Sequence, residues 1–186
     1  MKIQSKEPIL MHWFKSITVI LLIIITTNCD KQPPEEINEE EVINRVTLVL
    51  SDDTNQSETI TWNLGENSPT INLSPNSTYQ ATVSFYDATD PTDIDNITTE
   101  VINESDEHFV FYEVATAAMS IASASNDIID TQGIGINIKT QWTTSSASQG
   151  TLRIYLIHEP SSKTGSTRSA LGGASDVELD FPIIIQ

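Results

Sequence analysis

The chain has a single cysteine, Cys29, among its 186 residues, and it has few cationic side chains. One cysteine cannot form a disulfide within the chain, so a disulfide-stapled fold is excluded. Nine lysines and arginines stand against 26 aspartates and glutamates, which gives a formal net charge of −17. Because such an acidic surface repels phosphate backbones, we expect no nucleic-acid partner.

Motifs of the common enzyme classes are also missing. No G-x-S-x-G segment places a serine nucleophile on a strand-to-helix turn. The segment LGGAS, which contains Gly172 and Gly173, lacks the lysine and the spacing of a phosphate-binding loop. We therefore predict that the protein is not an enzyme, and we assign no catalytic residue.

The longest apolar run lies near the start of the chain. It covers residues 17–25 (ITVILLIII), and three lysines and a single acid precede it. A cationic front, an apolar stretch of about 7–15 residues and a small polar exit describe a secretory signal peptide. The run is shorter than the roughly 20 apolar residues of a membrane-spanning helix. We expect residues 1–28 to be a signal peptide, with translation starting at Met1 or Met11.

Cys29 follows in the segment TTNC, which resembles the lipobox of bacterial lipoproteins. In that motif the cysteine receives fatty-acyl chains such as palmitate and becomes the new N-terminus. The lipobox prefers Leu three places before the cysteine and Gly, Ala or Ser directly before it, where this chain has Thr26 and Asn28. A plain signal peptide with an incidental thiol is the alternative. We expect lipidation of Cys29 and an outer-membrane location, facing the periplasm or the cell surface.

Residues 29–41 (CDKQPPEEINEEE) contain two adjacent prolines and a cluster of acids. This composition cannot bury a core, so we predict a lipidated, acidic and extended tether. Removing residues 1–28 takes away three of the nine cations and one of the 26 acids, and the formal charge becomes −19. The remaining residues, 42–186, suit a single domain with its own core.

Apolar and polar residues alternate through most of this domain, with the two-residue period of half-buried strands. In segment 133–142, Ile134, Ile136, Ile138 and Trp142 fall on one face. The pattern recurs in other segments, namely 44–50, 58–64, 78–87, 108–114, 118–123, 151–159 and 176–185. Some eight or nine short strands with polar turns predict an antiparallel, immunoglobulin-like or Greek-key β-sandwich, with a β-barrel as the alternative.

Two further local predictions concern breaks in this pattern. The segment 97–108 is weakly amphipathic and contains the one plausible helix. Pro182 lies inside the last strand segment, where it cannot donate to a hydrogen-bond ladder. It therefore marks a sheet edge or a bulge.

Three short motifs lie at predicted strand ends: Glu107-His108, His158-Glu159-Pro160 and Gly172-Gly173. In this order behind a lipobox, they resemble small Gram-negative bacterial lipoproteins of unassigned function, over about residues 40–186. Some of these proteins have automatic names that allude to a type 1 periplasmic-binding fold. That fold consists of two doubly wound α/β lobes, and this sequence lacks the alternating helices.

The mature chain has two histidines, His108 and His158, and a glutamate adjoins each of them, Glu107 and Glu159. His158 has the parity of the core-facing residues of its strand, so we expect it to point inward near the strand's end. If the two strand ends are neighbours, these side chains form a three- or four-ligand site. Such a site suits zinc, copper or iron better than calcium. The alternative is that both histidines hydrogen-bond to loops at the rim.

Four aspartates in segment 87–95 (DATDPTDID) are a second candidate for a cation site. Their spacing misses the EF-hand pattern and the loop has no glycine, so we expect a solvated acidic turn.

The segment 160–175 joins the last two predicted strands and carries two of the six mature cations, Lys163 and Arg168. A connection of this length is often functional or mobile, so it is a candidate docking loop for a partner such as an outer-membrane transporter. A disordered hairpin tip is the alternative. The sequence as a whole predicts a lipid-anchored binding or accessory module that handles a metal ion or small ligand beside a transporter. The alternative is a structural or adhesive surface module without such a ligand.

Overall fold

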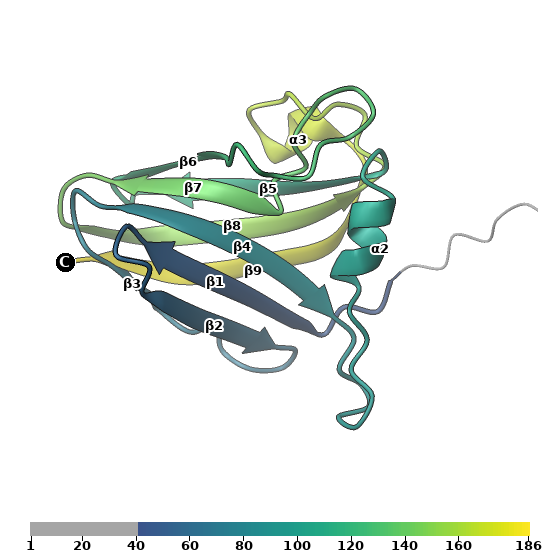
Figure 1. The fold of residues 1–186 in the computed structure, drawn as a ribbon, viewed down its shortest axis with the longest axis horizontal. Helices are drawn as coiled ribbons and strands as arrows, with labels where there is room; N and C mark the ends of the chain where they lie inside the picture. Colours follow the sequence, from purple (N-terminus) through teal and green to yellow (C-terminus); the bar gives the residue numbers. More distant parts are fainter. Residues whose placement is uncertain (1–40) are drawn as a thin grey trace, which may run out of the picture. The chain divides into compact units, whose positions relative to one another are not determined.

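A computed structural model describes residues 41–186, which form nine strands and two short helices (Figure 1). The five-stranded sheet has the order β2-β1-β4-β7-β6, with β1 Arg45–Asp52, β2 Ser57–Asn63, β4 Thr78–Tyr86, β6 Met119–Ser123 and β7 Lys139–Thr144. The four-stranded sheet has the order β3-β9-β8-β5, with β3 Ile71–Leu73, β5 His108–Ala115, β8 Ser148–His158 and β9 Ala174–Ile185. The helices are α2 Thr98–Asn103 and α3 Arg168–Leu171.

The two sheets stay separate and enclose one core, which confirms the all-β sandwich over the barrel alternative. All neighbouring strands are antiparallel except β3 and β9, which run parallel. The chain changes sheet after β2, β3, β4, β5 and β7, so most connections cross from one layer to the other, as in immunoglobulin-like sandwiches.

The core follows from the alternation in the sequence. Val46 and Leu48 of β1 are fully buried, and their Cα partners on β4 are Phe85 and Val83, which are also fully buried. Paired residues on antiparallel strands share a face, so the alternation of each strand reinforces that of its neighbour. Trp142 of β7 lies in the same core and has no exposed surface.

Strand β8 is buried on both faces near its end, although its sequence predicts a half-buried strand. Its outward-facing residues Tyr155 and Ile157 pack in a second cluster with Phe109 and with Leu171 of α3. Segment 160–175, which carries α3, therefore packs on the outer face of β5 and β8 at the histidine end of the four-stranded sheet (Figure 1).

The predicted strands all form, and the differences are local. Strand β7 begins at Lys139 and not at 133, because Asn137 has a positive φ of 64°, which a continuous strand does not allow. Helix α2 occupies six residues of the predicted segment 97–108. Pro182 lies where β9 has β8 as its one strand neighbour, since β3 pairs with β9 from Ile183 onward. The prediction of an edge is confirmed there.

In the part of the chain that the structure describes, no helix has the length and apolar character needed to cross a membrane. The predicted signal peptide, Cys29 and residues 30–40 of the predicted tether lie outside the described residues.

Candidate metal centre

The two histidines face each other at one end of the four-stranded sheet. Strands β5 and β8 pair so that His108 and His158 are Cα partners, and their rings stack with centroids 4.9 Å apart and planes 8° from parallel. Both residues are buried, with exposed fractions of 0% and 7%. The strand ends are therefore neighbours, as the metal-site hypothesis requires, and both side chains face inward.

All three sequence motifs converge on this point. The backbone N–H of Glu159 donates to the carbonyl of Glu107 over 2.7 Å, which joins the first two motifs. Gly173 has a φ of +69°, and a Cβ atom there would clash with the carbonyl of His158. The glycine thus lets β9 approach the end of β8 closely. The packing of this junction therefore explains the glycine of the third motif without reference to a metal.

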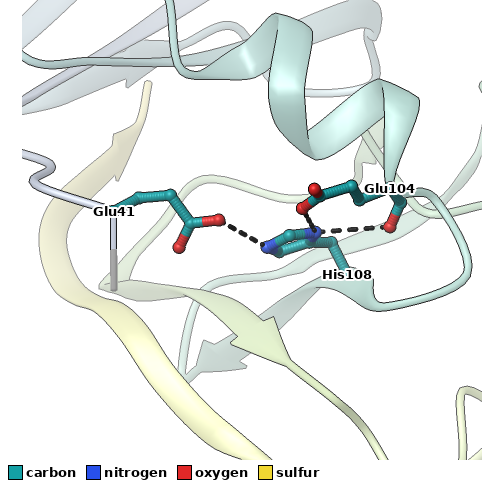
Figure 2. Close-up of side chains that lie close together, drawn as sticks. All are labelled: Glu41, Glu104 and His108. Carbon is teal, nitrogen blue, oxygen red and sulfur yellow. Dashed lines mark hydrogen bonds and ion pairs between the residues drawn. The ribbon is translucent and has the colours of Figure 1, made fainter. Parts of the chain in front are cut away.

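His108 lies between two carboxylates that come from opposite sides (Figure 2). Its Nδ1 is 3.3 Å from the backbone carbonyl of Glu104, the residue that follows α2, and 3.9 Å from a carboxylate oxygen of the same residue. Its Nε2 is 3.2 Å from Oε1 of Glu41, which lies four residues before β1. Both ring nitrogens therefore face acceptors, and a neutral ring can donate to only one of them. In the tautomer in which Nδ1 donates to the Glu104 carbonyl, the lone pair on Nε2 points towards Glu41.

This contact leaves buried polar atoms unsatisfied. The atoms of the 3.2 Å contact are not aligned for a hydrogen bond, and among the described residues neither Nε2 of His108 nor Oε2 of Glu41 has a hydrogen-bond partner. The side chain of Glu41 is only 5% exposed. A buried polar group without a partner costs about 1–3 kcal/mol, and more when it is charged. A proton or a metal cation between the two groups would remove this cost.

His158 belongs to two groups of potential ligands. Its ring nitrogen and carboxylate oxygens of Glu107 and Glu159 lie within 4.8 Å of one another, and the same holds for Glu41, His158 and Asp176. Glu107 and Glu159 are exposed, whereas Glu41 and Asp176 are partly enclosed. The predicted ligands therefore lie together, and the structure adds a more protected set.

Asp176 reaches this set because of a β-bulge. Between β8 and β9, Leu156 pairs with Val177 but Ile157 pairs with Ser175, so Asp176 is the extra residue. A bulge changes the direction in which a side chain points, and bulges are common beside functional sites.

Sequence reasoning assigned His108, His158, Glu107 and Glu159 to the site but not Glu41, Glu104 or Asp176. Glu104 precedes His108 by four residues, so a turn that brings i and i+4 together was a usable signal. Neither of the other two gave a local signal. Glu41 stands at the end of an acidic run. Alternation along β9 places Asp176 on the face opposite Val177, and the bulge that changes its direction is not visible in the sequence.

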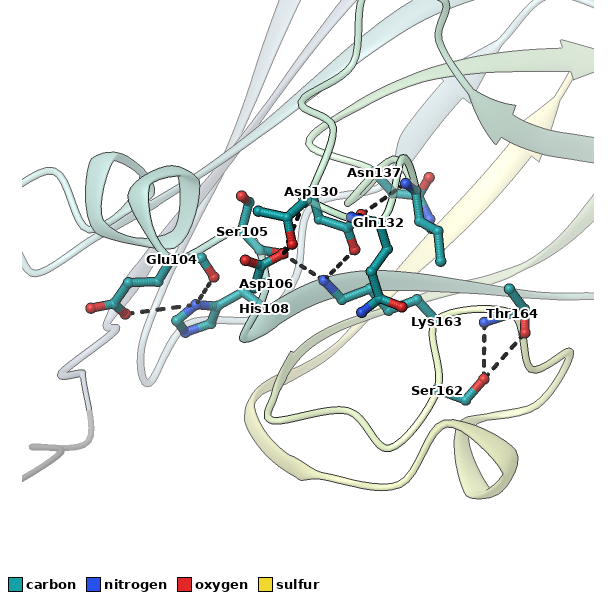
Figure 3. Close-up of polar contacts among 12 residues, drawn as sticks. Glu104, Ser105, Asp106, His108, Asp130, Gln132, Asn137, Ser162, Lys163 and Thr164 are labelled. Carbon is teal, nitrogen blue, oxygen red and sulfur yellow. Dashed lines mark hydrogen bonds and ion pairs between the residues drawn. The ribbon is translucent and has the colours of Figure 1, made fainter.

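The two cations of the predicted docking loop have partners within the domain, and Figure 3 shows those of Lys163. Nζ of Lys163 donates to the carbonyl of Ser105 over 2.5 Å and to Oδ2 of Asp130 over 2.9 Å. Arg168 donates to the carbonyls of Gly172 and Gly173. Lys163 thus ties segment 160–175 to the loops before β5 and β7, whereas the contacts of Arg168 with Gly172 and Gly173 lie within the segment. Docking of a partner stays a prediction that these contacts do not support.

Two of the four aspartates in loop 87–95, Asp87 and Asp90, accept hydrogen bonds from threonines of the same loop. Hydrogen bonds from Thr89 hold the pKa of Asp87 below its ordinary value, and bonds from Thr92 do the same for Asp90. This arrangement is typical of acidic turns and favours the solvated-turn interpretation.

The donor set at the end of β5 and β8 consists of imidazole nitrogens and carboxylate oxygens, which suits zinc and copper. Comparisons of the chain with protein-family models, with curated proteins and with solved structures found no match.

Proposed function

We propose that the protein is a lipid-anchored module of the bacterial cell envelope whose β-sandwich binds a transition-metal ion, zinc or copper, through His108 and His158. One observation carries this proposal: the two histidines are buried side by side and acidic side chains surround them. The role we assign is binding, beside an outer-membrane transporter, without catalysis.

The charge around the histidines supports a cation as the ligand. Within residues 41–186, the ion pairs of Glu41, Glu104 and Glu107 are all with the two histidines, and none of them is with a lysine or arginine. When the imidazoles are neutral, these carboxylates form no ion pair with a positive charge among the described residues. A bound divalent ion would supply that charge and would satisfy Nε2 of His108 and the buried oxygen of Glu41.

The proposed location rests on the sequence. The cationic and apolar start of the chain and the lipobox-like TTNC segment support export and lipidation of Cys29. The resemblance to small Gram-negative lipoproteins supports an outer-membrane address for the anchored domain.

Calorimetry tests the binding proposal directly. We would titrate residues 30–186, which keep Glu41 and omit the thiol of Cys29, with Zn²⁺ and with Cu²⁺. We expect tight binding that is lost in the His108→Ala/His158→Ala variant. Glu66→Gln/Glu113→Gln, which removes two acids outside the cluster, is the matched control and should bind like the wild type.

The opposite result would be no binding, or weak binding that is equal in the wild type and in the histidine variant. The histidines would then be structural, and the alternative of an adhesive or structural surface module would take the place of the metal-binding proposal.

A further inference from the structure

We infer that this cluster holds two metal ions, with the carboxylate of Glu41 as a bridge between them. The inference rests on the proposed metal-binding function and extends it to the number of ions and to the ligands of each ion.

The stacked geometry of the histidines argues against a single shared ion. The lone pair of an imidazole nitrogen lies in the plane of the ring, and the two ring planes are 8° from parallel with centroids 4.9 Å apart. Their lone pairs therefore do not converge on a point that is about 2.0–2.1 Å from both nitrogens, as one zinc ion requires. Within residues 41–186, no group of ligand atoms that lie within 4.8 Å of one another contains both histidines.

Each histidine instead has an acidic partner of its own, and both histidines share a third residue, Glu41. One group is Glu41, Glu104 and His108, and the other is Glu41, His158 and Asp176. Glu41 is thus common to both groups. An imidazole and two carboxylates for each ion leave an open coordination position, as in sites where a metal exchanges ligands.

Glu41 has the features that a bridging carboxylate needs. One of its oxygens, Oε1, lies 3.2 Å from Nε2 of His108, and the other, Oε2, is buried without a hydrogen-bond partner among the described residues. A bridging carboxylate gives one oxygen to each of two ions, and the ions of such pairs lie about 3.5–4 Å apart. The separation of the stacked rings is of the same order.

The remaining acids fit this division. Glu107 and Glu159 are exposed at the rim of the cluster, where water competes for their oxygens. We therefore assign the second ion to the more enclosed pair, Glu41 and Asp176. All five carboxylates help to offset the four positive charges that two divalent ions bring.

The number of ions is measured on the wild type. For residues 30–186 we expect two Zn²⁺ per chain by calorimetry and by native mass spectrometry. With two Cu²⁺ bound, electron paramagnetic resonance should show two magnetically coupled ions, as a carboxylate bridge predicts. Because these readouts need no variant, the result does not depend on how a substitution affects folding.

Variants then assign the ligands. Glu104→Gln and Asp176→Asn should each reduce the stoichiometry to one ion, and Glu41→Gln should weaken both ions at least about tenfold and abolish the magnetic coupling. The matched control, Glu66→Gln/Glu113→Gln, removes two acids outside the cluster and should keep two ions. Glu107→Gln/Glu159→Gln tests whether the second ion uses the exposed acids of the rim in place of Asp176. Thermal unfolding without metal checks that each variant is folded.

Each opposing result points to a different error. One ion per chain in the wild type, lost in the histidine double variant, overturns the two-ion inference and leaves the metal-binding function in place. No bound ion overturns both. Two ions without magnetic coupling overturn the bridge. Loss of one ion in Glu107→Gln/Glu159→Gln, with none lost in Asp176→Asn, overturns the assignment of the second ion's ligands.

Discussion

Lys163 is a buried lysine in a chain with a large excess of acids, and its ammonium group has two partners. The side chains of Lys163 and Asp130 are 6% and 0% exposed, and the pair joins segment 160–175 to the loop before β7. Burial alone would raise the pKa of Asp130. Hydrogen bonds from the Ile134 N–H and from Lys163 outweigh that effect, so the pKa lies below its ordinary value of 3.8.

Replacing Lys163 by Met should lower the free energy of unfolding by about 3–5 kcal/mol, because it leaves the Asp130 carboxylate buried without its cation. Denaturant titration at pH 7 measures this change. Lys139→Met is the matched control, since Lys139 forms no ion pair within residues 41–186. A loss below about 1 kcal/mol, the usual worth of an exposed pair, would contradict the prediction.

The same pair predicts a dependence on pH. The folded-state pKa of Asp130 is depressed, so its contribution to stability is present above pH 3.8 and is lost as the pH falls through the lower, folded-state value. In Lys163→Met the buried carboxyl takes up its proton at a higher pH than in the wild type. The difference in the free energy of unfolding between the two proteins should therefore narrow as the pH falls towards 3.8. A constant difference would contradict the assignment of the lost stability to the Lys163–Asp130 pair.

At the scale of elements, the junction of β8, segment 160–175 and β9 organises the end of the sheet that holds the histidines. Leu171 of segment 160–175 buries the outward-facing Tyr155 and Ile157 near the end of β8. The chain then turns into β9 at Gly172 and Gly173, both of which have positive φ. The bulge at Asp176 follows directly. A change at this junction should thus affect both stability and the position of Asp176.

Gly173→Ala tests this junction. Alanine at a positive φ costs of order 1–3 kcal/mol, and at Gly173 the new Cβ also meets the carbonyls of His158 and Glu159. Gly133 has a φ of +83° but open space around its Cβ position, so Gly133→Ala carries the conformational cost alone. Urea titration should show the larger loss for Gly173→Ala. Equal losses would mean that the close approach adds nothing.

Alternation of residue type predicted most elements, because the face on which a strand residue lies depends only on its position in the pleat. Strand β3 was missed because its three residues, Ile71–Leu73, are too few to show a period. Helix α3, with four residues, is also too short to show a period. In segment 133–142 the alternation continues through Ile136 and Ile138, which are buried as predicted, although Asn137 interrupts the strand.

At the scale of the whole molecule, the predicted anchor and the described domain are separate parts of one chain. Cys29→Ser should abolish fatty-acid labelling and release the protein from membranes into the soluble fraction. Gln32→Ala, three residues away, is the matched control and should leave labelling unchanged. Labelling that persists in Cys29→Ser would contradict lipidation at this residue.

Local sequence patterns predicted only part of the candidate metal site. The inward direction of His158 follows from strand parity, and the donor types follow from the two His–Glu pairs. The pairing of His108 with His158 required β5 and β8 to be neighbours in that register, and local patterns at two positions 50 residues apart do not specify it. Glu41 lies in the cluster because of the path of the chain into β1, and Asp176 because of the β-bulge. Neither feature has a local signature in the sequence.

By itself, the sequence determined the strands, the class of fold and the buried faces, because these depend on short-range alternation and on the burial of apolar side chains. It also supplied the prediction of a lipid anchor at Cys29. Only the tertiary structure decided which strand ends meet, which carboxylates surround the two histidines, and that segment 160–175 packs on the outer face of β5 and β8 near the histidines. These features arise from contacts between residues far apart in the chain, where the free energy of packing many side chains at once selects one register and one bulge.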